Sequence, residues 1–352
     1  MASMTSRSCP LLALLWLLWL LWLACAGVAA AAPAPQQEPI HRRHQQVFGA
    51  TLDLSIYGGT AARADQLAAD VFQEATRLHN KFHAWQPSEL TALNDAIARK
   101  QVYQSDAEMV AVLKSAAALA GRADNTFNPA IGQLIRLWGF QSSEIGAHVP
   151  LPADVRRLVE ANPRMSDLVF DGTRIASRNS AVMLDLGGFV KGYALDRAAA
   201  ILRAGQVKAA LISAGGNILA LGRPGQRPWR VGVQDPRGAG MIVQMALHDN
   251  EAIGTSGDYQ RYFMKDGRRR AHIIDPRSGE SVDLVASVTI ITAGGADPGT
   301  RSDGYTKPLF IAGPQHWQAM AQRLGLKEVL LIDTQRQVSM TAAMQSRIAA
   351  SK

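Results

Sequence analysis

Apolar and polar residues follow one another along most of the chain in patterns that predict both strands and helices. Segment 48–58, FGATLDLSIYG, alternates between apolar and polar positions and ends in a Gly-Gly pair, which indicates a strand and a turn. A helix is expected next, because apolar residues then recur at helical spacing. They are Leu67, Val71, Ala75, Leu78 and Phe82. A second helix is predicted from a capping box of Ser105 and Glu108 to Gly121.

The same patterns continue through the rest of the chain. The run AVMLDL (181–186) predicts a buried strand, and FVKGYALDRAAAILRAG predicts a helix that ends at Gly205. HWQAMAQRLGL predicts a late helix. Further strands are expected at KAALISAGG, WRVGVQDP, ASVTIITAGG and KEVLLID. Strands and helices mix without strict βαβ alternation, so the predicted class is α+β or mixed α/β.

The first thirty residues have the composition of a targeting segment rather than of a folded element. Arg7 precedes the dense apolar run LLALLWLLWLLWLACAGVA, and small residues suited to cleavage follow near 30–32. The sequence therefore predicts a cleaved signal peptide over 1–32 and a flexible Pro-rich linker over 33–46. A membrane anchor is an alternative, because the apolar run approaches the ~20 residues that span a bilayer. Lipidation of Cys25 is a third reading, although the residues before it fit such a site poorly.

Composition narrows the chemistry available to the mature chain. Both cysteines, Cys9 and Cys25, lie in this first segment, so a cleaved protein has no thiol for nucleophilic or metal-binding chemistry. The net charge of +8 favours an anionic ligand. The basic residues are scattered apart from 268–270, without interleaved aromatic residues, which argues against nucleic acid. We expect an exported protein, periplasmic or held at a membrane.

The segment DLGGFVKGYALD, from Asp185 to Asp196, carries the first candidate chemistry. Backbone N–H groups at a helix start carry partial positive charge and bind phosphate. Gly187 and Gly188 would allow close backbone approach, and Lys191 adds a cation. Taken alone, this segment is equally compatible with a structural strand-to-helix turn, since it matches neither a dinucleotide fingerprint nor a Walker loop.

Four more segments place polar residues at turns. SAGGNILALG (213–222) is a second Gly-Gly turn after an apolar strand, and AIGTSGDYQRYF (252–263) places Thr255 and Ser256 after a strand. RAHIIDPRSGE (270–280) contains His272, and RSDGYTKPLFIAG (301–313) contains Asp303. Each has a structural reading, since a lone His is more often structural and Asp-Pro commonly opens a turn.

Taken together and in order, these blocks resemble the ApbE family of flavin transferases (FAD:protein FMN transferases). HAWQPSELTALN looks like the family segment Y-x-P-x-S-E-L-x-x-L-N, and FNPAIGQLIRLWGF looks like F-D-P-T-V-G-P-L-x-x-L-W-G-F. DLGGFVKGYALD, SAGGNILALG, TSGDYQRYF and HIIDPRSG also follow the family closely. The resemblance runs from about residue 46 to about 335. It implies a domain over 47–340, a C-terminal tail over 341–352, and two lobes of mixed sheets with packed helices, related to the T-fold.

The resemblance also implies an activity. Family members bind FAD between two lobes with magnesium on the diphosphate. A Thr or Ser hydroxyl of a partner protein attacks the FMN phosphorus, and AMP leaves. Such phosphoryl transfer needs charge neutralisation and a positioned nucleophile, and a hard cation with oxygen ligands supplies the first. The expected partner is a membrane-associated electron-transfer subunit.

Residue by residue, the resemblance implies a metal site and a flavin pocket. The metal ligands would be the carbonyl of Gly188, the carboxylate of Asp303 and Thr306. His272 would lie near the diphosphate as a hydrogen-bond donor or proton carrier, so the catalytic set is Asp303, His272 and Thr306. The remaining residues would contact FAD: Trp85 as an aromatic wall, Phe127 and Asn128 on the adenosine side, Asp185 and Lys191, the hydroxyl donors Thr255 and Ser256, and Ile273 and Ile274 lining the pocket.

One departure from the family pattern bears on the metal. The family usually reads A-D-A-x-x-T-A-L, and the Thr is a metal ligand, whereas this chain reads S-D-G-Y-T-K-P-L. Lys307 therefore stands at the ligand position, and an ammonium cannot bind magnesium. Either Thr306 moves in through a local backbone shift, or Lys307 takes over part of the role of the cation. The second reading leaves open a flavin-binding protein, a slow FAD hydrolase or an accessory protein in electron-transfer complex assembly.

Overall fold

The computed structural model describes Ala2, residues 38–142 and residues 144–351. The predicted signal peptide, apart from Ala2, and residues 33–37 of the predicted linker lie outside this part of the chain. From Glu38 onward the chain forms one compact unit. No helix in the described part of the chain is long and apolar enough to cross a membrane.

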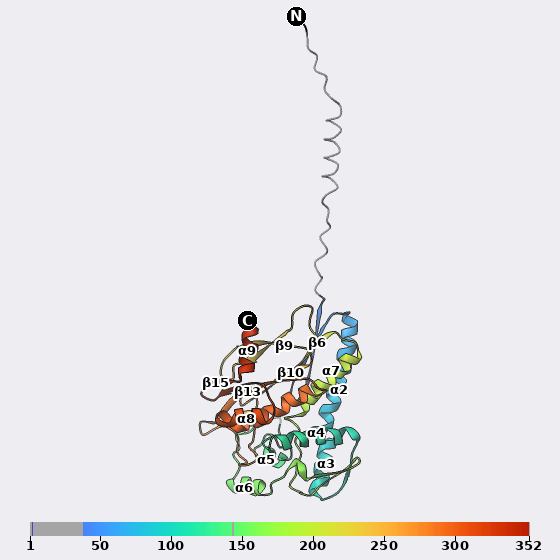
Figure 1. Ribbon diagram of the computed structural model, residues 1–352. Coiled ribbons are helices and arrows are strands. Elements are labelled where there is room, and N and C mark those ends of the chain that lie inside the picture. Colours follow the sequence, from blue (N-terminus) through green and yellow to red (C-terminus); the bar gives the residue numbers. More distant parts are fainter. Residues whose placement is uncertain (1, 3–37, 143, 352) are drawn as a thin grey trace. The chain divides into compact units, whose positions relative to one another are not determined.

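An eight-stranded sheet forms the centre of this unit (Figure 1). Its strands, in spatial order, are β1 (Ile40–Val47), β2 (Ala50–Tyr57), β6 (Ala209–Ala214), β7 (Asn217–Leu221), β10 (Glu251–Gly257), β13 (Val285–Ala293), β14 (Glu328–Asp333) and β15 (Val338–Met340). Neighbouring strands pair antiparallel. The sheet places β10 next to β7. The Gly215-Gly216 turn before β7 therefore lies beside Thr255 of β10, although the two are far apart in the sequence.

Both faces of the sheet are covered. One face packs against three helices, α2 (Ala61–Lys81), α7 (Val190–Ala204) and α8 (Pro298–Arg323). The other packs against a ribbon of β8 (Trp229–Gln234) and β9 (Met241–Leu247) and against α9 (Ala342–Ala350). Because it is covered on both sides, β13 is buried at eight consecutive positions, which include the polar residues Ser287, Thr289 and Thr292.

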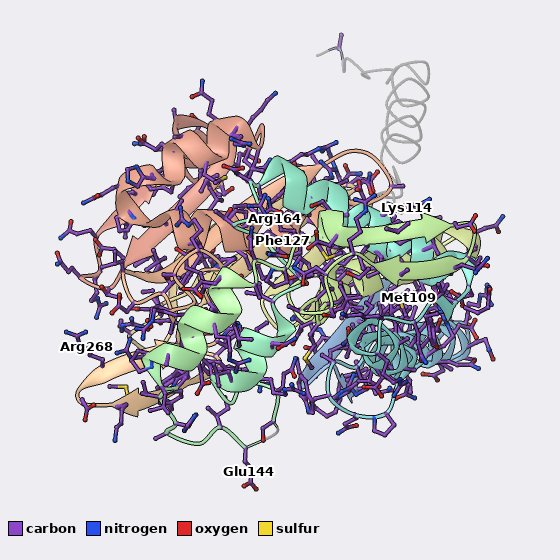
Figure 2. All side chains as sticks on the ribbon, turned by 90° about the horizontal axis from the view of Figure 1, so that it is seen from below. Met109, Lys114, Phe127, Glu144, Arg164 and Arg268 are labelled. Atoms are coloured by element: carbon purple, nitrogen blue, oxygen red, sulfur yellow. The ribbon has the colours of Figure 1, made fainter. Side chains whose placement is uncertain are left out.

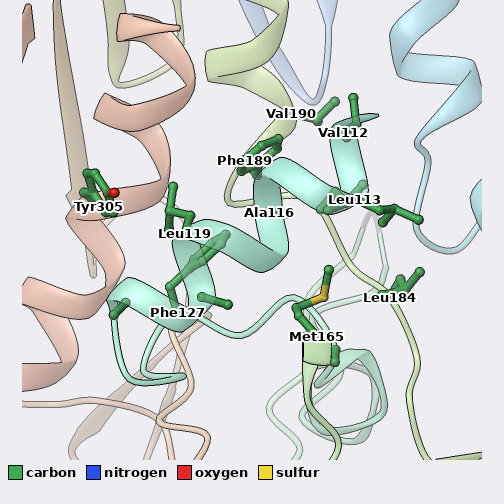
Figure 3. Close-up of a cluster of buried hydrophobic side chains, with 14 of the residues drawn as sticks. Val112, Leu113, Ala116, Leu119, Phe127, Met165, Leu184, Phe189, Val190 and Tyr305 are labelled. Carbon is green, nitrogen blue, oxygen red and sulfur yellow. The ribbon is translucent and has the colours of Figure 1, made fainter. Parts of the chain in front are cut away.

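Most of the remaining helices lie at the end of the molecule away from α9 (Figure 1). The helices are α3 (Glu89–Ala98), α4 (Ala107–Arg122), α5 (Gly132–Leu137), α6 (Pro152–Glu160) and the 3₁₀ helix η1 (Met165–Asp167). The strands are β3 (Tyr103–Gln104), β4 (Leu168–Asp171) and β5 (Arg174–Ser177), which form a small sheet, and β11 (Tyr262–Lys265) and β12 (Arg268–Ala271), which form a hairpin with Arg268 near its tip (Figure 2). Helix α4 packs through Leu113, Ala116 and Leu119 against the start of α7 and against α8 (Figure 3).

Helices α7 and α8 cross at unusually close range. A Cβ at Gly192 would lie 2.7 Å from the Cβ of Asp303 and closer still to the carbonyl oxygen of Gly299, so only glycine fits this crossing. Asp196 of α7 then caps α8, because its carboxylate accepts hydrogen bonds from Gly299 N (2.7 Å) and from Thr300 N (2.7 Å) and Oγ1 (2.6 Å). The crossing fixes the start of α7 against Asp303.

The mixed α/β class predicted from the sequence is confirmed, and most predicted elements form. Four local predictions were wrong. The linker expected over 33–46 contains strand β1, whose hydrogen bonds to β2 outweigh its polar sequence. The tail expected over 341–352 contains α9, which Thr341 caps and which buries Met344. Segment 181–186 alternates between half-buried and buried positions and forms only an isolated bridge, from Met183 to Ile131. Finally, Asp106 rather than Ser105 caps α4, which ends at Arg122.

Candidate functional site

A cavity of about 470 Å³ opens between the sheet, the first turn of α7 and the middle of α8. This volume lies in the range of small-molecule binding sites. Thirteen residues were predicted at the site, and all of them except Thr306 line this cavity. They are Trp85, Phe127, Asn128, Asp185, Gly188, Lys191, Thr255, Ser256, His272, Ile273, Ile274 and Asp303. Residues from six parts of the chain therefore converge here.

The Asp-Leu-Gly-Gly turn forms one wall of the cavity. Asp185 Oδ1 accepts a hydrogen bond from Gly187 N (2.9 Å), which closes a local Asx turn, and its Oδ2 accepts one from Gln141 Nε2 (2.9 Å). Lys191 lies in the first turn of α7 and donates to the carbonyl oxygen of Gly187 (2.7 Å). The carboxylate of Asp185 thus shapes the turn, and the ammonium of Lys191 lies at the cavity beside Gly188.

A buried asparagine holds the segment that leads into this turn. Asn94 of α3 donates through Nδ2 to the carbonyl oxygen of Leu184 (2.9 Å) and accepts at Oδ1 from Leu184 N (2.7 Å). The side chain thereby satisfies the backbone groups that a neighbouring strand would otherwise bind. On the other side, Asp185 N donates to the carbonyl oxygen of Pro129 (2.8 Å). The sequence did not single out Asn94, although a polar residue within the apolar face of α3 was a signal.

Asp303 and Lys307 form the floor of the cavity. Both lie on α8, one helical turn apart, and their side chains form an ion pair. Asp303 is only 1% exposed, and its Oδ2 accepts a hydrogen bond from Gly192 N (3.0 Å). Lys307 Nζ also donates to the carbonyl oxygen of Asp303 (2.7 Å). Burial alone would raise the pKa of Asp303, but the charges of Lys307 and Lys191 and these hydrogen bonds hold that pKa below its ordinary value.

Thr306 points away from the cavity. Its hydroxyl donates to the carbonyl oxygen of Asp303 (2.7 Å) and lies 2.7 Å from Ser256 Oγ. With the proton of Thr306 directed to Asp303, the hydroxyl of Ser256 is engaged with Thr306 in this arrangement. The donor role expected of Ser256 toward a ligand stays a prediction. The hydroxyl of Thr255 pairs with that of Thr289 (2.9 Å).

Aromatic side chains line the mouth and one end of the cavity. Trp85 is 39% exposed at the mouth, and the guanidinium of Arg261 lies 5.7 Å from its ring centre. Phe127 stacks on Phe189 (centroids 6.3 Å apart, planes at 25°). Asn128 donates to the carbonyl oxygen of Pro163 (2.8 Å) and accepts from Ala130 N (3.0 Å), which leaves one N–H and one lone pair for a ligand.

His272 faces the cavity from the base of the β11–β12 hairpin. Its Nδ1 lies 3.2 Å from the carbonyl oxygen of Arg261, which can only accept, so Nδ1 carries the proton and Nε2 is an acceptor. Burial, followed by repulsion from Lys191, lowers the pKa of His272 to about 3. The ring is therefore neutral at pH 7. Arg261 was not singled out from the sequence, although its place within the block TSGDYQRYF was a signal.

The charged side chains of the lining favour an anion. Lys191, Arg261 and Lys307 are cationic, whereas Asp185 and Asp303 are anionic, so the lining carries one excess positive charge. The three cations come from α7, α8 and the loop before β11. Convergence of positive charge in a partly enclosed site increases the affinity for phosphate groups.

The residues expected to hold magnesium do not fit a divalent cation. Lys307 covers Gly188, since a Cβ at Gly188 would lie 3.0 Å from Lys307 Cε, and both Asp303 carboxylate oxygens already accept hydrogen bonds. At about 4 Å and an effective dielectric constant of 20, repulsion between an ammonium and a divalent ion is roughly 8 kcal/mol. Among residues 38–142 and 144–351, no cluster of three or more His, Cys, Asp or Glu side chains could hold a metal.

Comparisons of this chain with protein-family models and with characterised proteins point to the same family. The model of the ApbE family matches residues 48–331. An FAD:protein FMN transferase of Rhodobacter capsulatus is 36% identical over 304 residues, covering 86% of this chain and 57% of the relative. An FAD:protein FMN transferase of Klebsiella pneumoniae is 31% identical over 309 residues, covering 86% of this chain and 92% of the relative.

The chain belongs to the ApbE family.

Solved structures of the family have the same fold. The ApbE protein of Thermotoga maritima superposes with a TM-score of 0.81 at 27% identity, covering 88% of this chain and 99% of that one. The flavinyl transferase ApbE of Pseudomonas stutzeri gives a TM-score of 0.77 at 26% identity, covering 91% and 100%. The family and fold expected from the six motif blocks are confirmed, and the named relatives are transferases of the expected type. The roles of individual residues remain predictions.

Proposed function

We propose that this protein transfers FMN from FAD to a Thr or Ser hydroxyl of a partner protein and releases AMP. The observation that carries the proposal is the convergence, at one cavity, of the Gly-Gly turn at Gly188 with the ammonium groups of Lys191 and Lys307. Trp85 and Phe127 line the same cavity and offer aromatic surfaces to a ligand that has two aromatic ends and a central diphosphate. Membership of the ApbE family supports the same reaction.

The reaction is a phosphoryl transfer with a simple balance of bonds. The acceptor hydroxyl oxygen forms a bond to the FMN phosphorus, and the bond from that phosphorus to the bridging oxygen breaks. AMP leaves with the bridging oxygen, and the hydroxyl proton passes to a base or to water. In such reactions the protein contributes mainly position and charge stabilisation. Lys191 and Lys307 are positioned to stabilise the charge that develops on the diphosphate oxygens.

His272 is the residue best positioned to take up the hydroxyl proton. Its Nδ1 proton is held by the carbonyl oxygen of Arg261, so Nε2 is the acceptor on the cavity side. A pKa of about 3 makes the free ring a weak base. A bound diphosphate opposes the repulsion from Lys191 that contributes to this low pKa, and therefore makes Nε2 more basic when the substrate is present.

Magnesium has no step in this proposal. The expectation of a magnesium-dependent enzyme came from the family motif, and in this chain Lys307 lies where the motif has a ligand. A cation in that position supplies positive charge to a diphosphate without a metal.

We further propose that the protein is exported through residues 1–32 and acts on a membrane-associated electron-transfer subunit. The n-region, apolar run and small-residue site support export. The membrane-bound acceptor is an inference from the family resemblance.

The direct test is to incubate the purified protein with FAD and a peptide that contains an Asp-Gly-x-x-Thr acceptor, and to measure AMP and peptide mass. We expect AMP and FMN-modified peptide in equal amounts. A peptide with Ala in place of the acceptor Thr is the control, and it should gain no mass. Release of free FMN and AMP without modified peptide would instead support the alternative of an FAD hydrolase, and FAD retention without AMP would support a flavin-binding accessory protein.

A further inference from the structure

The buried lysine at the floor of the cavity has an arrangement that a merely structural ion pair does not require. The side chain of Lys307 is 16% exposed and lines the cavity, whereas its partner Asp303 is 1% exposed. Two of the three N–H donors of Lys307 Nζ are directed to Asp303, one to the carboxylate and one to the carbonyl oxygen. The third remains for a group in the cavity.

The position of this ammonium coincides with the position that the family motif assigns to a metal ligand. Lys307 stands four residues after Asp303, and its Cε would lie 3.0 Å, and its Nζ 3.7 Å, from a Cβ at Gly188. The ammonium therefore lies between Gly188 and Asp303, the two residues expected to hold the cation. Residues 298–312 of α8 are regular, with non-helical backbone only at Gly313. No local backbone shift brings Thr306 to the cavity.

We propose that Lys307 is a built-in replacement for the divalent cation, so that this protein binds the diphosphate of FAD, and transfers FMN, without magnesium. Lys307, which lies against Gly188, and Lys191, whose Nζ binds the carbonyl oxygen of Gly187, act as a pair, and each donates a charge-assisted hydrogen bond to a phosphate oxygen. Asp303 is then a positioning residue, which holds the ammonium of Lys307 through the hydrogen bonds already described. This inference rests on the proposed function, because it takes FAD as the ligand.

A buried carboxylate without its cation would be costly, which explains why Asp303 and Lys307 occur together. Asp303 is enclosed by α7 and α8, and Gly192 N supplies only a neutral donor. Replacing Lys307 with a neutral oxygen-bearing residue would leave the carboxylate without a counter-charge and create the oxygen set of the family motif. The single substitution Lys307→Thr therefore tests whether lysine and metal exchange roles.

The experiment compares the wild-type protein with Lys307→Thr, and with Lys327→Thr as a matched control that removes an exposed lysine before β14. FAD affinity is measured by quenching of flavin fluorescence, in EDTA and in magnesium. Mg²⁺ binding is measured by calorimetry with FAD present, and AMP release is measured with the acceptor peptide. For the wild type and Lys327→Thr we expect the same FAD affinity and AMP release, within about twofold, in both buffers.

For Lys307→Thr we expect FAD affinity in EDTA to fall about ten- to a hundredfold, the range for loss of one hydrogen bond between charged groups. Magnesium should restore the affinity, and calorimetry should show Mg²⁺ binding that the wild type lacks. A tenfold or larger loss of wild-type affinity or AMP release in EDTA would overturn the inference and leave the proposed function intact. A Lys307→Thr variant that gains no response to magnesium would also overturn it. Absence of FAD binding by the wild type in both buffers would instead overturn the proposed function itself.

Discussion

The crossing of α7 and α8 at Gly192 allows a sharp test of how the fold positions the site. In Gly192→Ala, the new methyl carbon would start 2.2 Å from the carbonyl oxygen of Gly299 and 2.7 Å from the Cβ of Asp303, whereas ordinary contacts begin at 3.4 Å. The shorter contact requires the two helices to part by about 1.2 Å, the difference between 3.4 and 2.2 Å. Overpacking of this kind costs roughly 1–3 kcal/mol, and the gain in helix propensity returns about 1 kcal/mol. We expect a net loss of up to about 2 kcal/mol in the free energy of unfolding.

The same change should weaken the site, because Gly192 N donates to Asp303 and so fixes the floor of the cavity. Denaturant unfolding measures the stability, and flavin fluorescence quenching measures FAD affinity, for which we expect a loss of roughly tenfold or more. Gly121→Ala in α4 is the matched control, since no atom lies within 4 Å of a Cβ there. That variant should gain about 0.5–1 kcal/mol and keep its FAD affinity. If Gly192→Ala matched Gly121→Ala in both measurements, the crossing would have no role in positioning the site.

Three further predictions concern single side chains of the site. Asn94→Leu leaves the buried N–H and carbonyl of Leu184 unpaired, so its denaturation midpoint should shift by the equivalent of about 1–3 kcal/mol; an unchanged midpoint would contradict the bridging role. Trp85→Ala should weaken FAD binding by about 1–3 kcal/mol in fluorescence titrations, whereas Trp85→Tyr should retain most of it; equal losses would exclude a stacking wall. His272 has a folded-state pKa of about 3, so the unfolded chain binds more protons below about pH 6.5, and stability falls as pH falls toward 3. At pH 5 the His272 contribution is up to about 2 kcal/mol, and His272→Gln should show a shallower acid slope than the wild type if this assignment holds.

The fold class and most helices and strands could be predicted from the sequence, because the spacing of apolar residues reflects which side chains are buried. The sequence-based prediction failed where hydrogen bonds to distant groups, rather than the apolar pattern of the segment itself, determine the local structure. Segment 181–186 has the composition of a strand, but Asn94 and Pro129 supply its hydrogen bonds, and neither residue is near it in the sequence. Strand β1 was mistaken for a linker because a polar edge strand has no apolar period.

For the site, the motif blocks indicated which residues converge but not how their polar atoms are used. Thr306 and Lys307 are adjacent, and only the regular helix decides that Lys307 faces the cavity while Thr306 faces Ser256. Arg261 was missed because its role depends on the neighbouring Trp85 ring and on carbonyl groups about 120 residues earlier in the chain.

The central claim is that the Gly-Gly turn before α7 and the middle of α8 jointly bind the diphosphate of FAD. The most direct measurement is a crystal structure of the protein with FAD, grown in EDTA. We expect the diphosphate to lie between Gly188 and the ammonium groups of Lys191 and Lys307, with an aromatic ring of the ligand against Trp85. A flavin bound outside this cavity, or a diphosphate out of reach of Lys307, would contradict this claim.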